Sequence, residues 1–167
     1  MDGEGALALG LVEGPEFGRV QRGETVRGVS PDQVLGPARS GRKIVLSGDT
    51  RPCEALRVAA HRADVLVHEA TFAEEERERA AENGHSTAIQ AATIAQEAEV
   101  TLLALNHMSM RHPIGQLRDE ARGVFPATVV PRDFDTIEIP LPERGEPELI
   151  HWDERMAPAE EPAPFTP

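Results

Sequence analysis

The chain has 167 residues, a length typical of one domain, and 40% of them are hydrophobic, which is enough to form a core. It has no long apolar run, no signal-peptide pattern and a single cysteine, Cys53, so we expect no membrane span, no internal disulfide and no cysteine-based zinc finger. The formal net charge of −12 argues against broad, non-specific binding of nucleic acid, and we expect a cytoplasmic protein.

Glycine, proline and hydrophobic patterns predict the elements in chain order. Residues 1–42 are rich in glycine and proline, which predicts an irregular segment with a hairpin and one short strand within 26–34. The middle of the chain then alternates between short apolar runs and stretches with helical spacing. This alternation predicts strands at 43–47, 64–68 and 101–105, and helices at 52–62, 86–97 and 113–123.

The remaining segments are predicted by charge and capping residues. The highly charged stretch 73–83 predicts a solvated loop or helix, and Ser86 is a suitable N-cap for the helix that follows. Two further strands are expected at 127–130 and 136–139. From residue 140 to 167 the chain is acidic and rich in proline, so we expect this tail to be disordered.

Alternation of strands and helices predicts an α/β fold. Asp49, Glu69 and His107 each lie just past the carboxyl end of a predicted strand, where α/β sheets assemble their sites. A carboxylate and neutral imidazoles are suitable ligands for Zn²⁺ or Mn²⁺. Asp49 and His107 are only two evident ligands, however, and a catalytic zinc site needs about three.

Four sequence blocks resemble one known family. They are Ser47-Gly48-Asp49-Thr50, His68-Glu69-Ala70-Thr71-Phe72, Gly84-His85-Ser86-Thr87 and Asn106-His107-Met108-Ser109-Met110-Arg111-His112. In their order and separation they are similar to ribonuclease Z, the tRNA 3′-processing endonucleases of the metallo-β-lactamase superfamily. The resemblance covers about residues 10–135. It implies that residues 43–139 form the C-terminal half of an αββα sandwich and that residues 1–42 follow the family's tRNA-binding arm.

The resemblance also implies a role for each matching residue. Asp49 and His107 would be metal ligands, in a site that holds two Zn²⁺ when complete, with Mn²⁺ as an alternative. His85 would assist departure of the leaving oxygen, and Glu69 would orient His85 by a hydrogen bond. Substrate contacts are implied for five further residues, Ser86, Thr87, Arg111, His68 and Thr71. The substrate would be precursor tRNA, and the family is typically homodimeric.

The sequence also departs from the family's pattern. The main metal motif, His-x-His-x-Asp-His, is absent from these 167 residues, and so is a further histidine ligand. The resemblance therefore implies the C-terminal half of such an enzyme, which requires the other half for a complete site. One half alone would leave a sheet face uncovered, which predicts self-association. Two alternatives stay open: a catalytically incomplete half-domain that needs a partner chain, and another metallo-β-lactamase-type phosphodiesterase.

Overall fold

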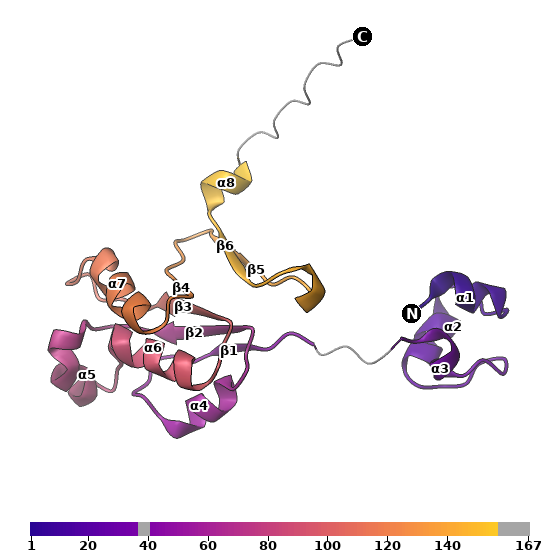
Figure 1. The fold of residues 1–167 in the computed structure, drawn as a ribbon, viewed down its shortest axis with the longest axis horizontal. Coiled ribbons are helices and arrows are strands. Elements are labelled where there is room, and N and C mark those ends of the chain that lie inside the picture. Colours follow the sequence, from indigo (N-terminus) through magenta and orange to yellow (C-terminus); the bar gives the residue numbers. More distant parts are fainter. Residues whose placement is uncertain (37–40, 157–167) are drawn as a thin grey trace, which may run out of the picture. The chain divides into compact units, whose positions relative to one another are not determined.

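The computed structural model describes residues 1–36 and 41–156, which fall into two compact units, Met1–Gly41 and Arg42–Pro167 (Figure 1). The division lies one residue before the end of the predicted leading segment. Each unit has its own buried cluster of hydrophobic side chains. In the described residues, no helix is long and apolar enough to cross a membrane.

The first unit consists of three short helices, α1 (Gly3–Ala8), α2 (Pro15–Gln21) and α3 (Pro31–Val34). The prediction of an irregular segment with a strand was wrong. Val26 and Val29 form only an isolated antiparallel bridge, and the Ser30 backbone N–H then donates to Gln33 Oε1 (2.8 Å) at the start of α3. The apolar side chains that we read as a strand instead fill a small core, which contains Ala6, Leu11, Val20, Val26, Val29 and Val34.

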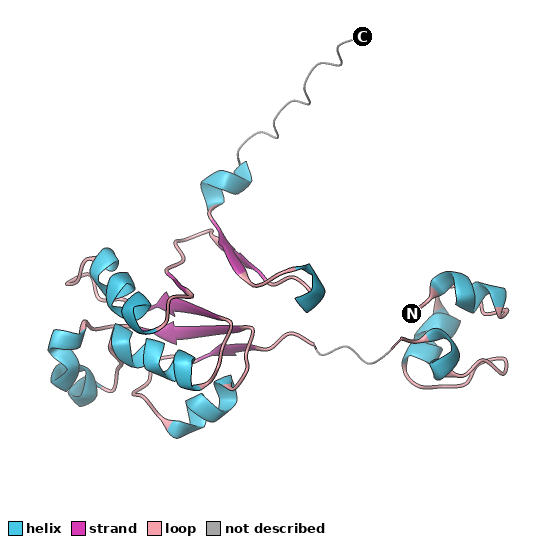
Figure 2. Cartoon of the chain, in the orientation of Figure 1, coloured by secondary structure: helices cyan, strands magenta, loops and turns pink. Residues whose placement is uncertain are grey.

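The second unit is built on a parallel sheet, which confirms the predicted α/β class (Figure 2). Its strands lie in the order β1 (Ile44–Leu46), β2 (Val65–Glu69), β3 (Leu102–Asn106) and β4 (Thr128–Val129). Three helices connect them, α4 (Glu54–Ala60), α6 (Ala88–Glu97) and α7 (Ile114–Val124). The short apolar runs of the sequence thus form parallel strands, of which β2 and β3 are mostly buried, as such runs are in α/β folds.

The three connecting helices share one core with the sheet. Leu66, Leu103 and Leu105 belong to the same buried cluster as Leu56 of α4 and Leu117 of α7. The buried face of α6 is mostly alanine, which lets the helix backbone approach the sheet closely; these residues are Ala88, Ala91, Ala92, Ile94 and Ala95. On β1, Val45 packs against this core, whereas its neighbours Ile44 and Leu46 are 52% and 72% exposed.

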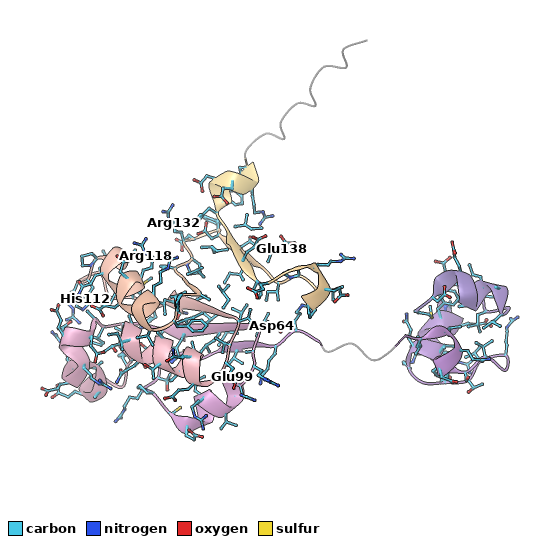
Figure 3. All side chains as sticks on the ribbon, viewed as in Figure 1. Asp64, Glu99, His112, Arg118, Arg132 and Glu138 are labelled. Atoms are coloured by element: carbon cyan, nitrogen blue, oxygen red, sulfur yellow. The ribbon has the colours of Figure 1, made fainter. Side chains whose placement is uncertain are left out.

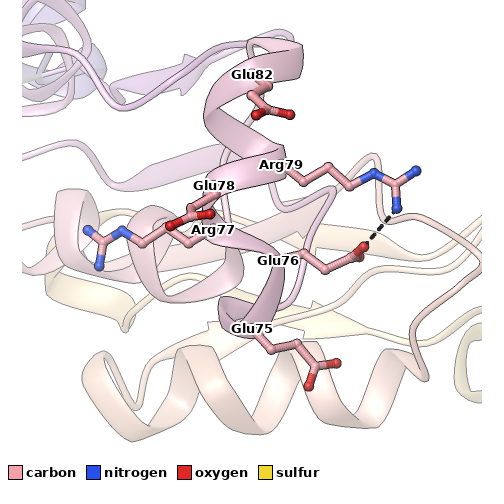
Figure 4. A pocket seen from close by; sticks show the side chains of 6 residues that line it. All are labelled: Glu75, Glu76, Arg77, Glu78, Arg79 and Glu82. Atoms are coloured by element: carbon pink, nitrogen blue, oxygen red, sulfur yellow. Dashed lines mark hydrogen bonds and ion pairs between the residues drawn. The ribbon is translucent and has the colours of Figure 1, made fainter.

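The charged stretch between β2 and α6 forms a short 3₁₀ helix, η1 (Glu74–Glu76), and then α5 (Arg77–Asn83). Its charged side chains surround an open hollow, where Glu76 and Arg79 form an ion pair of 3.0 Å (Figure 4). Gly84 ends α5 with a left-handed φ of 80°, which glycine adopts without steric cost. The solvated face predicted from the charges is therefore mainly helical.

The chain after β4 forms a hairpin. Strands β5 (Thr136–Glu138) and β6 (Glu148–Ile150) pair antiparallel, with the 3₁₀ helix η2 (Pro142–Arg144) between them, and α8 (Trp152–Met156) follows. Residues 140–156, which we expected to be disordered, thus contain regular structure. Strand β6 has only three residues and depends on pairing with β5 and on contacts of Asp135, described below, and the acidic composition indicates neither. The rest of the predicted tail, 157–167, lies outside the described residues.

Candidate active site

The polar side chains that follow β1, β2 and β3 meet at the carboxyl edge of the parallel sheet. Gly48 turns the chain with φ +60° before Asp49, and His107 itself has a left-handed φ of +50° directly after β3. The left-handed conformation is costly for a non-glycine residue and is found where surrounding contacts hold it. Here Thr71 Oγ1 lies 3.0 Å from the His107 carbonyl oxygen, and the Ser109 N–H donates to the Thr71 carbonyl (3.2 Å).

Asp49, His85 and His107 form a cluster that suits a metal ion. Each offers one ligand atom, and these atoms all lie within 4.8 Å of one another. Asp49 Oδ1 is 3.5 Å from His107 Nδ1, and the rings of His85 and His107 stack with centroids 5.3 Å apart. One carboxylate and two imidazoles are a donor set that fits Zn²⁺ or Mn²⁺. The sequence indicated two of these ligands, and the fold adds His85 as a third candidate.

Glu69 lies beneath this cluster and is almost completely buried. Its Oε1 accepts from the Thr50 N–H (2.8 Å) and lies 2.8 Å from His85 Nδ1. Its Oε2 accepts from the hydroxyl and the backbone N–H of Thr71, at 2.7 and 3.2 Å. Burial pushes the pKa of Glu69 upward, but the hydrogen bonds from Thr71, Thr50 and His85 outweigh it and hold the pKa below its usual range. Glu69 is therefore a carboxylate that keeps a proton on His85 Nδ1.

The segment around His85 is held in place at two further points. Ser86 Oγ donates to the Thr50 carbonyl (2.7 Å), which connects this segment to the loop after β1. Thr87, and not the predicted Ser86, is the N-cap of α6: its Oγ1 accepts from the Gln90 N–H (3.2 Å) and donates to Glu74 Oε2 (2.7 Å). The signal was present in the sequence, because Thr87 and Gln90 have the spacing of a capping box.

Three of the predicted substrate-binding residues are buried in this structure. The side chains of Ser86, Thr87 and His68 are fully buried among their own structural partners. Their contact with a substrate stays a prediction. His68 Nδ1 lies 2.7 Å from the Glu69 carbonyl, while its Nε2 has no partner among the described residues. Burial lowers the pKa of His68, which keeps the ring neutral at this position.

Thr71 and Arg111 lie closer to the cluster or to its opening. Thr71 is mostly buried, and its Oγ1 lies 2.9 Å from His107 Nδ1, so its hydroxyl contacts the ring of the candidate ligand His107. Arg111 is exposed, and its guanidinium lies over the Phe72 ring, 5.4 Å from the centroid. This cation–π contact positions the guanidinium, which also interacts electrostatically with Glu76, and no hydrogen bond from the guanidinium is found among the described residues. Thus the structure brings Asp49, Glu69, His85 and His107 together.

These features define a class: an α/β chain with a carboxylate–imidazole cluster, suited to a divalent cation, at the carboxyl edge of a parallel sheet. No protein-family model matches the chain. Among curated proteins, a ribonuclease Z from Myxococcus xanthus is 50% identical over 144 residues, covering 81% of this chain and 47% of that protein. A ribonuclease Z from Salinibacter ruber is 47% identical over 155 residues, covering 89% of this chain and 48% of that protein. The resemblance to ribonuclease Z is thereby confirmed.

The chain spans about half the length of the curated relatives it matches. Similar solved structures include the short form of human tRNase Z, which is 32% identical with a TM-score of 0.49 over 60% of this chain and 34% of that chain. The metallo-β-lactamase fold protein YhfI from Bacillus subtilis is 28% identical, with a TM-score of 0.49 over 52% of this chain and 35% of that chain. Because these TM-scores are low, the family likeness rests on the sequence identity and the α/β class on the chain's own sheet.

Proposed function

We propose that this chain is the C-terminal part of an endoribonuclease that removes 3′ trailers from precursor tRNA. The observation that carries the proposal is the cluster of Asp49, His107 and His85 over the buried Glu69 carboxylate, in a chain up to 50% identical to proteins named Ribonuclease Z. We expect such an enzyme in the cytoplasm and as a homodimer.

Asp49 and His107 are the residues that would hold the metal, with Zn²⁺ as the first candidate and Mn²⁺ as the second. A divalent ion there would supply positive charge beside the phosphate and lower the pKa of a water molecule toward neutrality. Because we assign His85 Nε2 to proton transfer, Asp49 and His107 are the two candidate ligands that remain among the described residues, fewer than two ions require. We propose that the remaining ligands, in a His-x-His-x-Asp-His motif, are supplied by the other half of the enzyme.

His85 would give a proton to the ribose 3′ oxygen as the phosphodiester bond breaks. Glu69 Oε1 lies 2.8 Å from His85 Nδ1, so the proton that is transferred belongs to Nε2. The Glu69 carboxylate, in contact with Nδ1, fixes the ring orientation so that Nε2 faces the substrate side of the ring. Arg111, held over Phe72 at the opening of the cluster, would bind a phosphate oxygen.

The test joins this chain to the part of the Myxococcus xanthus ribonuclease Z that it does not match. We expect the joined protein, with Zn²⁺, to cleave a precursor tRNA at the start of its 3′ trailer. His85→Ala should lower the rate by about 10²- to 10⁴-fold, as expected for a general acid. His61→Ala is the matched control, because His61 is exposed at the end of α4 and should leave the rate unchanged.

Three results would contradict the proposal. If His85→Ala cleaves precursor tRNA as fast as the parent, His85 is not the proton donor. A joined protein that hydrolyses bis(p-nitrophenyl) phosphate but leaves precursor tRNA intact would favour another metallo-β-lactamase-type phosphodiesterase. Folded protein without either activity would favour a catalytically incomplete half-domain.

A further inference from the structure

Apart from the candidate active site, the second unit has a cavity of about 600 Å³ between α7 and the segment that runs from β4 to β6. One wall is a single face of α7, where Ile114, Arg118 and Arg122 recur every four residues. The other wall includes Arg132, which precedes β5, and His151, which follows β6. Figure 3 labels Arg118 and Arg132, which come from these two walls. None of these residues belongs to the Asp49–His107 cluster.

The hairpin wall is held by one buried carboxylate, Asp135, whose side chain is 2% exposed. Its Oδ2 accepts from the Arg132 N–H and lies 2.9 Å from His151 Nδ1, while its Oδ1 accepts from the Trp152 N–H (3.0 Å). Asp135 thereby ties the segment before β5 to the residues after β6. Because His151 Nδ1 is engaged, its Nε2 is the ring nitrogen left for a ligand.

The cavity concentrates positive charge in a chain whose net charge is −12. Three arginines and a histidine line it, against a single acid, Asp133. Arg118 also pairs with Asp119 (2.8 Å), and Arg122 Nε donates to the Thr128 carbonyl. The Arg132 guanidinium has no hydrogen bond or ion pair within the part of the chain that the structure describes. Guanidinium groups with unused N–H donors are suited to phosphate oxygens.

The rest of the lining is apolar and consists mainly of Met108, Ile114, Val129, Val130 and Leu149. An apolar surface beside guanidinium groups suits a ligand that combines a flat ring with a phosphate, and stacking on such surfaces tolerates any base. Inorganic phosphate alone would leave the apolar part unused. Met108 directly follows His107, so the cavity begins beside the candidate metal ligand.

We propose that this cavity binds one nucleotide unit of the RNA strand, adjacent to the phosphate that is cleaved. Arg118, Arg132 and His151 hold its phosphate, and the apolar lining receives its base. The proposal rests on the proposed function for its RNA substrate, but the nucleotide-binding property belongs to this chain alone. It assigns Arg118 and Arg132 to substrate binding and not to the chemical step.

The test is a titration of the joined protein with adenosine 5′-monophosphate, followed by NMR of its methyl groups. We expect saturable shifts of the Met108, Ile114 and Leu149 methyls, with smaller shifts for adenosine or inorganic phosphate. Arg118→Ala and Arg132→Ala should each raise the dissociation constant about tenfold, the effect of losing one charge-assisted contact. Arg57→Ala is the matched control, since Arg57 is a partly exposed arginine on α4 that pairs with Glu54 and lies outside the cavity.

Arg132 is exposed, so Arg132→Ala should keep the fold, and the unperturbed methyl spectrum verifies this. The inference is overturned if the shifts fall outside the cavity or if both cavity variants bind as well as Arg57→Ala. In the joined protein, the cavity variants should raise KM for precursor tRNA with little change in kcat. Nucleotide binding in the cavity without cleavage of precursor tRNA would contradict the proposed function but not the binding site. Cleavage of precursor tRNA without nucleotide binding in the cavity would contradict this inference alone.

Discussion

At the scale of single residues, Glu69 connects the loops after β1 and β2 with His85. It accepts hydrogen bonds from Thr50 and Thr71 while also contacting His85. Its type and position were predicted from the sequence as part of the family resemblance. The contacts with Thr50 and Thr71 were not, because they depend on how the loops after β1 and β2 meet at the edge of the sheet.

We expect Glu69→Gln to lower tRNA cleavage by the joined protein by about 10- to 100-fold, the usual cost of losing a residue that orients a catalytic group. A glutamine has a single side-chain oxygen, so it can still accept from the Thr50 N–H or from the Thr71 N–H but not from both, and it supplies no charge to His85. Glu69→Ala leaves those buried N–H groups unpaired and should cost about 1–3 kcal/mol of the free energy of unfolding as well. Cleavage rates and urea unfolding separate the two effects. Equal activity of Glu69→Gln and the parent would exclude the orienting role.

Asp135 links pH to the stability of the hairpin. Hydrogen bonds from Arg132, Trp152 and His151 lower its pKa from 3.8 to about 2, against the opposing effect of burial. Since the folded state binds the proton more weakly than the unfolded chain, the carboxylate stabilises the fold above pH 4. This contribution is lost as the pH falls from about 4 to about 2.

Trp152 is the single tryptophan of the chain and lies beside Phe134, so its fluorescence reports on this hairpin. We expect the parent to show a fluorescence change between about pH 4 and pH 2. Asp135→Asn should abolish that change and give the altered signal already at pH 7. Asp153→Asn, at an exposed position nearby, serves as the control and should follow the parent. A transition retained in Asp135→Asn would show that another group is responsible.

At the scale of elements, the strands and connecting helices from β1 to β5 were predicted closely and their ends less well. The start of α6 is an example, because both Ser86 and Thr87 can serve as an N-cap. The tertiary contact from Thr87 Oγ1 to Glu74 Oε2, together with the Gln90 capping box, decides for Thr87. Ser86 is then free to bind the Thr50 carbonyl and to hold the loop before the helix.

Thr87→Ala should therefore destabilise the chain by about 1 kcal/mol, the typical cost of removing an N-cap, with an added loss from the buried Glu74 contact. Thr87→Ser keeps the hydroxyl and should stay close to the parent. Thr101→Ala is a control at an exposed threonine. Urea unfolding measures all three variants. A Thr87→Ala midpoint equal to that of Thr101→Ala would mean that the cap contributes nothing to stability.

At the scale of the whole molecule, the exposed apolar residues of β1 bear on the predicted self-association. Ile44 and Leu46 are 52% and 72% exposed, whereas Val45 between them packs against the core. Because they are two residues apart, Ile44 and Leu46 lie on the same face of the strand, and exposed apolar side chains on one face favour association with another surface. In a complete enzyme we expect the other half of the protein to cover them.

We expect the 167-residue chain to self-associate at micromolar concentrations and Leu46→Gln to shift it toward monomer. Met110→Gln is the matched control, since Met110 is fully exposed but lies in the loop after β3. Sedimentation velocity over a range of concentrations measures the distribution. A parent chain that is monomeric throughout, with a cooperative melt, would refute the prediction.

The sequence by itself determined the α/β class, the three strands whose carboxyl ends lie at or just before Asp49, Glu69 and His107, and the likeness to ribonuclease Z. Short apolar runs, caps and motifs are local signals, and local signals can be read along one chain. Only the tertiary structure decided that Ser86, Thr87 and His68 are buried, that His85 joins the metal cluster, and that the acidic segment forms a hairpin around Asp135. Burial and convergence depend on which segments pack together, and no spacing along the chain specifies that.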